Sequence, residues 1–131
     1  SGLKYLKNLD ISRTPIRDDE MRYLKVFKNL NSLNLEYNRI TDKGVLYLKD
    51  LKNINKLYLS YTMVTDAGLS DYFKPNNKFI ELSLEGLIIT DDIVPYLMKM
   101  KNLKILKISY TRISIESKEK LEKALPLCKI Y

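Results

Sequence analysis

Apolar residues recur along this chain in one phrase, a Leu-x-x-Leu-x-Leu run followed by a polar position and another apolar residue. The clearest copy contains Leu30, Leu33 and Leu35, followed by Asn38 and Ile40. Residues two apart on a strand face the same side. The phrase therefore predicts a short strand with one buried face, followed by a turn.

The phrase occurs five times at a nearly constant step. The position of Asn38 recurs at Thr14, Thr62, Leu87 and Thr111, so the steps are 24, 24, 25 and 24 residues. A fixed step of this size predicts stacked copies of one structural unit. Stacking is required because one unit cannot bury its own apolar faces. The extra residue of the third step is expected in the loop at 74–78.

A helix is expected after each strand. In the second copy Val45, Leu48 and Leu51 have the spacing of one helical face. Acidic residues recur where the helices should begin, and we interpret them as helix-start residues, favoured by the helix dipole, rather than metal ligands: Asp18, Asp42, Asp66 and Asp91. Asparagines recur where the helices should end, and we expect them to adopt the left-handed conformation: Asn29, Asn53 and Asn102.

Net charge raises the question of an anionic partner. The 131 residues carry a formal charge of +7, from 23 basic and 16 acidic side chains. The basic residues are mostly lysines in helix ends and loops, whereas nucleic-acid sites usually gather arginines and aromatic residues in one groove. We interpret the lysines as a solvated rim, with nucleic acid or an anionic membrane as the less favoured partners.

Catalytic chemistry finds little support in the composition. The chain has no histidine, so its serines and threonines lack the commonest activating base. Cys128 is the one cysteine, which excludes an intrachain disulfide and a thiolate metal cage, and we expect it to pack as a small apolar residue. No cofactor or metal is expected, and the chain is predicted not to be an enzyme. Localisation stays open, with a lean to the cytoplasm from the single cysteine.

These phrases resemble the leucine-rich repeat family over essentially the whole chain. The resemblance is to the subtype with a repeat of about 24 residues and helices on the convex side, found in bacterial and ribonuclease-inhibitor-like members. It implies an α/β fold, a right-handed solenoid with a curved parallel sheet on the concave side. It also implies that Asn38 bonds to backbone inside its turn, with Thr14, Thr62 and Thr111 as partial substitutes.

Residues 3–131 are expected to form one domain of five repeats followed by a C-terminal cap strand. Ser1 and Gly2 are interpreted as a cloning remnant. The first strand has no covering element in the sequence before Leu6, and an unpaired strand edge invites association. We therefore expect the chain to be the C-terminal part of a longer protein. Its N-terminal edge is expected either to be shielded by self-association or to leave the first repeat frayed.

The best candidate site lies on the concave face. Tyr37, Tyr61 and Tyr110 occupy equivalent positions in three repeats, with Tyr58 nearby. Tyrosine is enriched at interfaces because it combines apolar area with a polar tip, although copied repeats can also inherit a residue together. Charged residues of both signs are expected around the tyrosines, an arrangement more typical of an interface than of a catalytic carboxylate pair: Glu36, Glu85, Lys56 and Lys107.

The leading hypothesis is therefore a non-enzymatic module that binds another protein through its concave face. The alternative is a substrate-selecting accessory domain of a larger enzyme. Electrostatic binding to nucleic acid or membrane is a third possibility.

Overall fold

The computed structural model describes residues 2–76 and 78–131. Two predictions fall on residues outside this part of the chain. One assigns Ser1 to a cloning remnant, and the other includes Asn77 in the loop that holds the extra residue.

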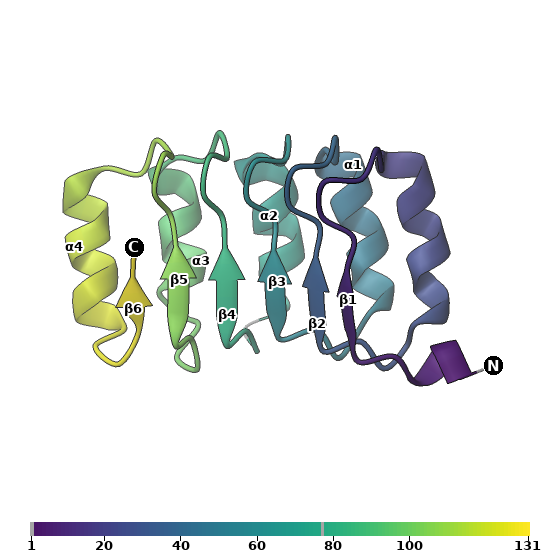
Figure 1. The fold of residues 1–131 in the computed structure, drawn as a ribbon. Coiled ribbons are helices and arrows are strands. Elements are labelled where there is room, and N and C mark those ends of the chain that lie inside the picture. Colours follow the sequence, from purple (N-terminus) through teal and green to yellow (C-terminus); the bar gives the residue numbers. More distant parts are fainter. Residues whose placement is uncertain (1, 77) are drawn as a thin grey trace.

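The strands form one parallel sheet in chain order. Figure 1 shows them side by side, all running in the same direction. Each pairs with the next so that equivalent residues of neighbouring repeats face each other, as Leu33 faces Leu57. The strands are β1 (Asn8–Asp10), β2 (Ser32–Asn34), β3 (Lys56–Tyr58), β4 (Glu81–Ser83), β5 (Ile105–Lys107) and β6 (Lys129–Ile130).

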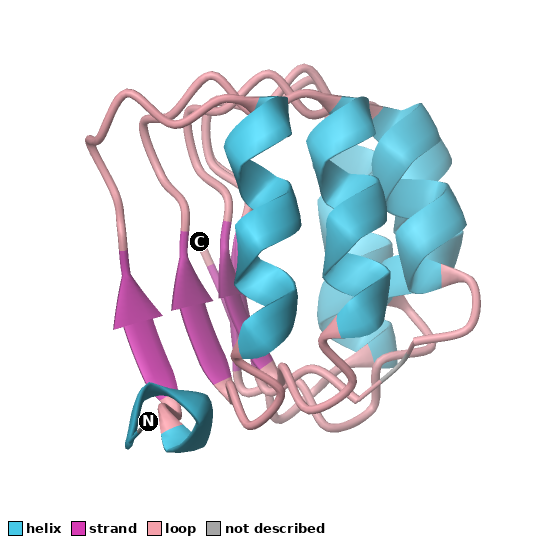
Figure 2. Ribbon diagram, turned by 90° about the vertical axis from the view of Figure 1, so that its right-hand side faces the viewer, coloured by secondary structure: helices cyan, strands magenta, loops and turns pink. Residues whose placement is uncertain are grey.

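The helices that follow the strands form a second layer along one face of the sheet (Figure 2). They are η2 (Asp18–Val26), α1 (Asp42–Val45), η3 (Leu46–Asp50), α2 (Asp66–Phe73), η4 (Asp91–Ile93), α3 (Val94–Leu97) and α4 (Ile115–Ala124), where η denotes a 3-10 helix. A further 3-10 helix, η1 (Gly2–Tyr5), precedes β1 and lies outside this layer. Among the described residues, no helix is long and apolar enough to cross a membrane. The predicted fold class, an α/β leucine-rich repeat solenoid, is confirmed.

Columns of leucine fill the space between the two layers. Leu33, Leu57, Leu82 and Leu106 are at most 1% exposed, and each lies one strand spacing from the next. Leu9 of β1 is only partly buried, because it lies at the end of this column. Self-association through this edge remains a prediction.

The recurring aspartates connect neighbouring repeats. Asp18 accepts a hydrogen bond from the backbone nitrogen of Thr41 at 2.8 Å, and Asp42 accepts one from Thr65 at the same distance. Both carboxylates also accept the threonine hydroxyl. The same bond joins Asp66 to Thr90 at 3.0 Å and Asp91 to Ser114 at 2.7 Å. The carboxylates do lie in the first helical turns, but the sequence analysis missed that their partners belong to the next repeat.

The prediction for the recurring asparagines is wrong. The described non-glycine residues with positive φ lie in the opposite loops, so Asn29, Asn53 and Asn102 do not adopt the left-handed conformation. Instead, the side-chain nitrogen of Asn29 donates to the carbonyl of Lys4 at 2.9 Å, and that of Asn53 donates to Lys28 at 3.1 Å. These two side chains therefore connect the loop that precedes a strand to the equivalent loop of the repeat before it.

We predict that Asp42→Ala lowers the free energy of unfolding by about 1–3 kcal/mol, because a half-buried backbone donor at Thr65 loses its acceptor. Urea denaturation would measure the change. Asp50→Ala is the control, since Asp50 is exposed and makes no such contact in the described chain. Equal stability of the two variants would contradict a stabilising role for the carboxylate contacts.

Candidate functional site

The loops that follow the strands share an unusual backbone conformation. Arg13, Tyr37, Tyr61 and Tyr110 have φ between 55° and 60°, and Gly86 has φ of 70° at the equivalent position. Bulky residues rarely adopt positive φ. Backbone hydrogen bonds to the next repeat hold the conformation, since Tyr37 donates to Ser60 at 3.1 Å and Tyr61 donates to Glu85 at 2.8 Å.

The side chains at these positions form a stack. The guanidinium carbon of Arg13 lies 3.9 Å from the centre of the Tyr37 ring. The rings of Tyr37 and Tyr61 are nearly parallel, with centres 4.9 Å apart. Tyr61 in turn covers Gly86, where a Cβ atom would collide with its ring. Tyr110 lies beyond this break, 81% exposed. The result is an ordered row of aromatic groups open to solvent.

A hollow of about 290 Å³ lies beside this row. It brings together six of the eight predicted site residues, namely Tyr37, Tyr58, Tyr61, Glu36, Glu85 and Lys107. Tyr110 lines a neighbouring hollow together with Glu85 and Lys107. Lys56, the eighth, lines neither hollow and lies on β3 between Ser32 and Glu81.

The polar groups in the hollow are bonded to one another. Glu36 accepts from the Ser83 hydroxyl at 2.9 Å, and Ser83 and Ser60 share a hydrogen bond of 2.6 Å. The Ser60 oxygen accepts from the backbone nitrogen of Glu85 at 2.9 Å. Such a network fixes the floor of the hollow, and it presents oriented polar groups rather than an activated nucleophile.

Tyr58 is fixed by a residue that the sequence analysis did not select for the site. Its hydroxyl donates to the carboxylate of Glu81 on the neighbouring strand. Burial, followed by this bond and by the charge of Glu81, raises the pKa of Tyr58 to about 12. The phenol therefore remains a neutral donor at physiological pH.

The sequence analysis also missed a second exposed column. Met63 and Ile88 are each 58% exposed. They lie next to the tyrosine column, at the position that precedes the buried Val64 and Ile89. Strict alternation of exposed and buried residues after each turn was the signal that could have found them. We use the name turn edge for the exposed apolar residues Tyr37, Tyr61, Met63, Ile88 and Tyr110.

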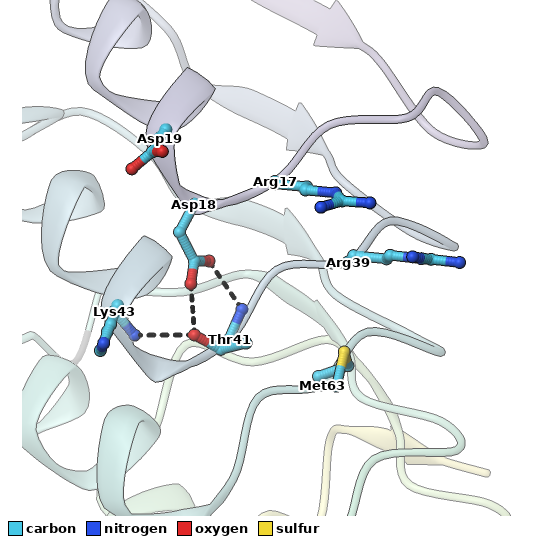
Figure 3. A pocket seen from close by; sticks show the side chains of 7 residues that line it. All are labelled: Arg17, Asp18, Asp19, Arg39, Thr41, Lys43 and Met63. Carbon is cyan, nitrogen blue, oxygen red and sulfur yellow. Dashed lines mark hydrogen bonds between the residues drawn. The ribbon is translucent and has the colours of Figure 1, made fainter.

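Arginines adjoin the turn edge. Arg17, Arg39 and Met63 line a hollow of about 550 Å³. Figure 3 shows the two guanidinium groups extending in the same direction, away from Asp18 and Asp19. Asp18 is turned instead toward Thr41, with which it bonds. Both arginines are exposed, and neither forms an ion pair within the described residues.

The described residues offer no cluster of metal ligands: among them, no group of three or more Cys, Asp or Glu residues is placed to hold a metal ion. Cys128 is half-buried, and burial raises the pKa of its thiol. The arrangement is suited to non-covalent recognition.

Comparison with known proteins supports the repeat architecture. Residues 28–49 match the family described as Leucine Rich repeat. No curated protein matches the sequence. Two internalins of Listeria monocytogenes have similar structures: InlF, with a TM-score of 0.77 and 20% identity, and internalin C2, with 0.72 and 27%. A leucine-rich repeat protein of Leptospira interrogans has a TM-score of 0.58 and 25% identity.

These proteins are much longer than this chain. The matches cover 97%, 99% and 98% of this chain but 34%, 54% and 31% of the three structures, in the same order. The comparisons therefore establish a leucine-rich repeat solenoid similar to bacterial ones. The narrower resemblance to ribonuclease-inhibitor-like members remains a prediction.

We predict that Gly86→Ala destabilises the protein by about 1–2 kcal/mol, the cost of a Cβ atom in the left-handed conformation, plus the displacement of the Tyr61 ring. Urea denaturation separates the two effects when Gly86→Ala is made both in the wild type and in the Tyr61→Asn variant. In the Tyr61→Asn variant, Gly86→Ala should be less destabilising by the part that comes from displacing the ring. If Gly86→Ala then had no effect on stability, the backbone at Gly86 would not be strained.

We predict that Tyr58 titrates at about pH 12, as measured by NMR of its ring carbons. Because the pKa is raised on folding, its contribution to stability is complete below the usual pKa of 10.0 and is lost as pH rises toward 12. Glu81→Gln should lower the pKa but keep it above 10.0, since burial is the larger cause. A return to 10.0 would make the hydrogen bond the main cause.

Proposed function

We propose that this leucine-rich repeat solenoid is a non-enzymatic protein-binding module. The partner contacts the turn edge and the adjoining hollow on the concave face. The observation that carries this proposal is the stack of Tyr37 on Tyr61, exposed to solvent and fixed at both backbones.

The stack is suited to binding because its geometry is set before the partner arrives. An interface loses about 0.5–1.5 kcal/mol for each flexible side chain that it immobilises. Tyr37 is already held between Arg13 and Tyr61, so little of that loss remains. Aromatic residues, methionine and arginine are also the types enriched in interface cores. The turn edge holds the tyrosines and Met63, and Arg39 adjoins it.

The hollow presents charged groups to the partner. Glu36, Glu85 and Lys107 place charges of both signs around Tyr58 and Tyr61. Lys56 lies two residues before Tyr58 on β3. A mixed set of charges selects a partner through complementary groups rather than through net charge. The partner is therefore expected to place an apolar side chain on the tyrosines and polar groups over the hollow.

The test is a pull-down from source lysate with the wild type and with the triple variant Tyr37→Asn, Tyr61→Asn and Tyr110→Asn. Asparagine is chosen because it tolerates positive φ, so the turns keep their backbone while the rings are lost. A partner captured by the wild type should bind the variant at least about 30-fold more weakly, since an aromatic anchor contributes about 2 kcal/mol or more.

The control is Tyr23→Ala with Leu46→Ala, which removes exposed apolar groups from η2 and η3 in the helical layer. This variant should retain the partner. Loss of the partner from the control, together with retention by the triple variant, would place the interface on the helical layer and overturn the proposal.

A further inference from the structure

Lysines gather on the edge of the solenoid opposite the turn edge, where helices end and strands begin (the lower edge of Figure 1). The loops there, at 27–31, 51–55, 74–76, 78–80, 99–104 and 125–128, contain no acidic residue, although the exposed Asp50 and Asp71 lie in the helix ends that adjoin them. We use the name lysine edge for the lysines of these loops and of the adjoining turns: Lys4, Lys7, Lys25, Lys28, Lys49, Lys52, Lys74, Lys78, Lys99, Lys101 and Lys104.

The fold holds several of these lysines in register. The carbonyl groups of Lys4 and Lys28 accept from Asn29 and Asn53, each in the following repeat. The carbonyl of Lys52 accepts from the ammonium of Lys78. Lys4, Lys28, Lys52 and Lys101 occupy equivalent positions of their repeats, so like charges recur along the edge. Like charges that recur in this way repel one another.

Three lysines of this edge have partners within the protein. Lys49 forms an ion pair of 2.7 Å with Asp71. Lys78 donates to the carbonyl of Lys52, and Lys101 donates to that of Ala124 at 3.0 Å. The pKa of Lys78 is lowered, first by burial and then by the charge of Lys52. The second of these causes reflects the neighbouring positive charge.

The other lysines are not neutralised. Within the described chain, the ion pair of Lys49 and Asp71 is the only one. The lysines without ion pair or hydrogen-bonded ammonium in the described residues are all exposed: Lys4, Lys7, Lys25, Lys28, Lys52, Lys74, Lys99 and Lys104. Proximity to the negative ends of the helices favours lysine here, but the dipole of short helices does not neutralise eight full charges. These charges are therefore available to anions outside the chain.

Apolar side chains accompany the lysines. Leu127 lies in the loop between α4 and β6 and is 93% exposed, and Val26 ends η2 and is also exposed. Exposed apolar groups among lysines are typical of surfaces that contact the interface of a bilayer. Nucleic-acid surfaces instead favour arginine and stacked aromatic groups, and the loops that carry the lysine edge contain no arginine.

From this combination we infer that the lysine edge binds an anionic lipid membrane as a peripheral surface, with lysines at the headgroups and Leu127 entering the interface. A cluster of four to eight basic residues suffices for such attraction. In this orientation the turn edge faces away from the membrane, because the two edges lie at opposite ends of the strands. The inference stands apart from the proposed partner site, since no residue is shared.

The experiment is co-sedimentation with phosphatidylcholine vesicles that contain or lack phosphatidylglycerol. The wild type should bind only the anionic vesicles, and more weakly as salt is added. Lys28→Glu with Lys52→Glu and Lys104→Glu should weaken binding at least 100-fold, since each lysine near the surface contributes about 1 kcal/mol, or about fivefold. Thermal unfolding should show this variant folded, because its changes relieve repulsion.

The matched control is Lys43→Glu with Lys118→Glu and Lys120→Glu, which changes the net charge equally but away from the lysine edge. It should keep most of the vesicle binding. Equal loss in both variants would reduce the effect to net charge and overturn the inference.

Leu127→Ser separates membrane from nucleic acid. It should weaken binding to the anionic vesicles and leave any binding to double-stranded DNA unchanged. Binding to DNA without binding to anionic vesicles would assign the lysine edge to nucleic acid and overturn the inference, as would failure to bind either.

Discussion

The structure depends on parallel pairing in strict register, with every repeat one strand spacing from the next. Under this constraint each residue meets its counterpart from the neighbouring repeat, as Leu33 meets Leu57 and Asn34 meets Tyr58. Each side chain of a column must therefore tolerate the residue at the equivalent position of the next repeat, about 4.8 Å away. Leucine does so by burial, tyrosine by stacking, and asparagine by bonding to the preceding loop.

The turn after each strand carries backbone strain because of this constraint. Every repeat needs positive φ at the same position, yet only Gly86 is a glycine. For Tyr37 and Tyr61 the strain is offset by ring stacking and by backbone hydrogen bonds. Tyr110 has no ring partner in the described structure and is largely exposed. Strain that packing does not repay is a feature of functional positions, which is why Tyr110 belongs to the proposed interface.

Repetition made the fold predictable from the sequence. Five copies in register locate the strands, the buried leucines and the columns that face the hollow, because each copy confirms the others. Contacts between copies could not be obtained in this way. The bond from Thr41 to Asp18 spans 23 residues, and its existence depends on the axial offset of two loops, which no local pattern encodes. The same holds for Asn29. The sequence predicted a left-handed backbone conformation for it, whereas its side chain donates a hydrogen bond to the carbonyl of Lys4.

Parallel topology also explains why the two edges differ in charge. All the helices that follow strands begin at the turn edge and end at the lysine edge, so their dipoles align and favour acids at one edge and bases at the other. The acids are then used internally, because Asp18, Asp42 and Asp66 each accept hydrogen bonds from the next repeat. Most of the lysines have no such internal partner among the described residues. Positive charge is therefore left exposed along the lysine edge, while the opposite edge presents aromatic groups with Arg17 and Arg39 beside them.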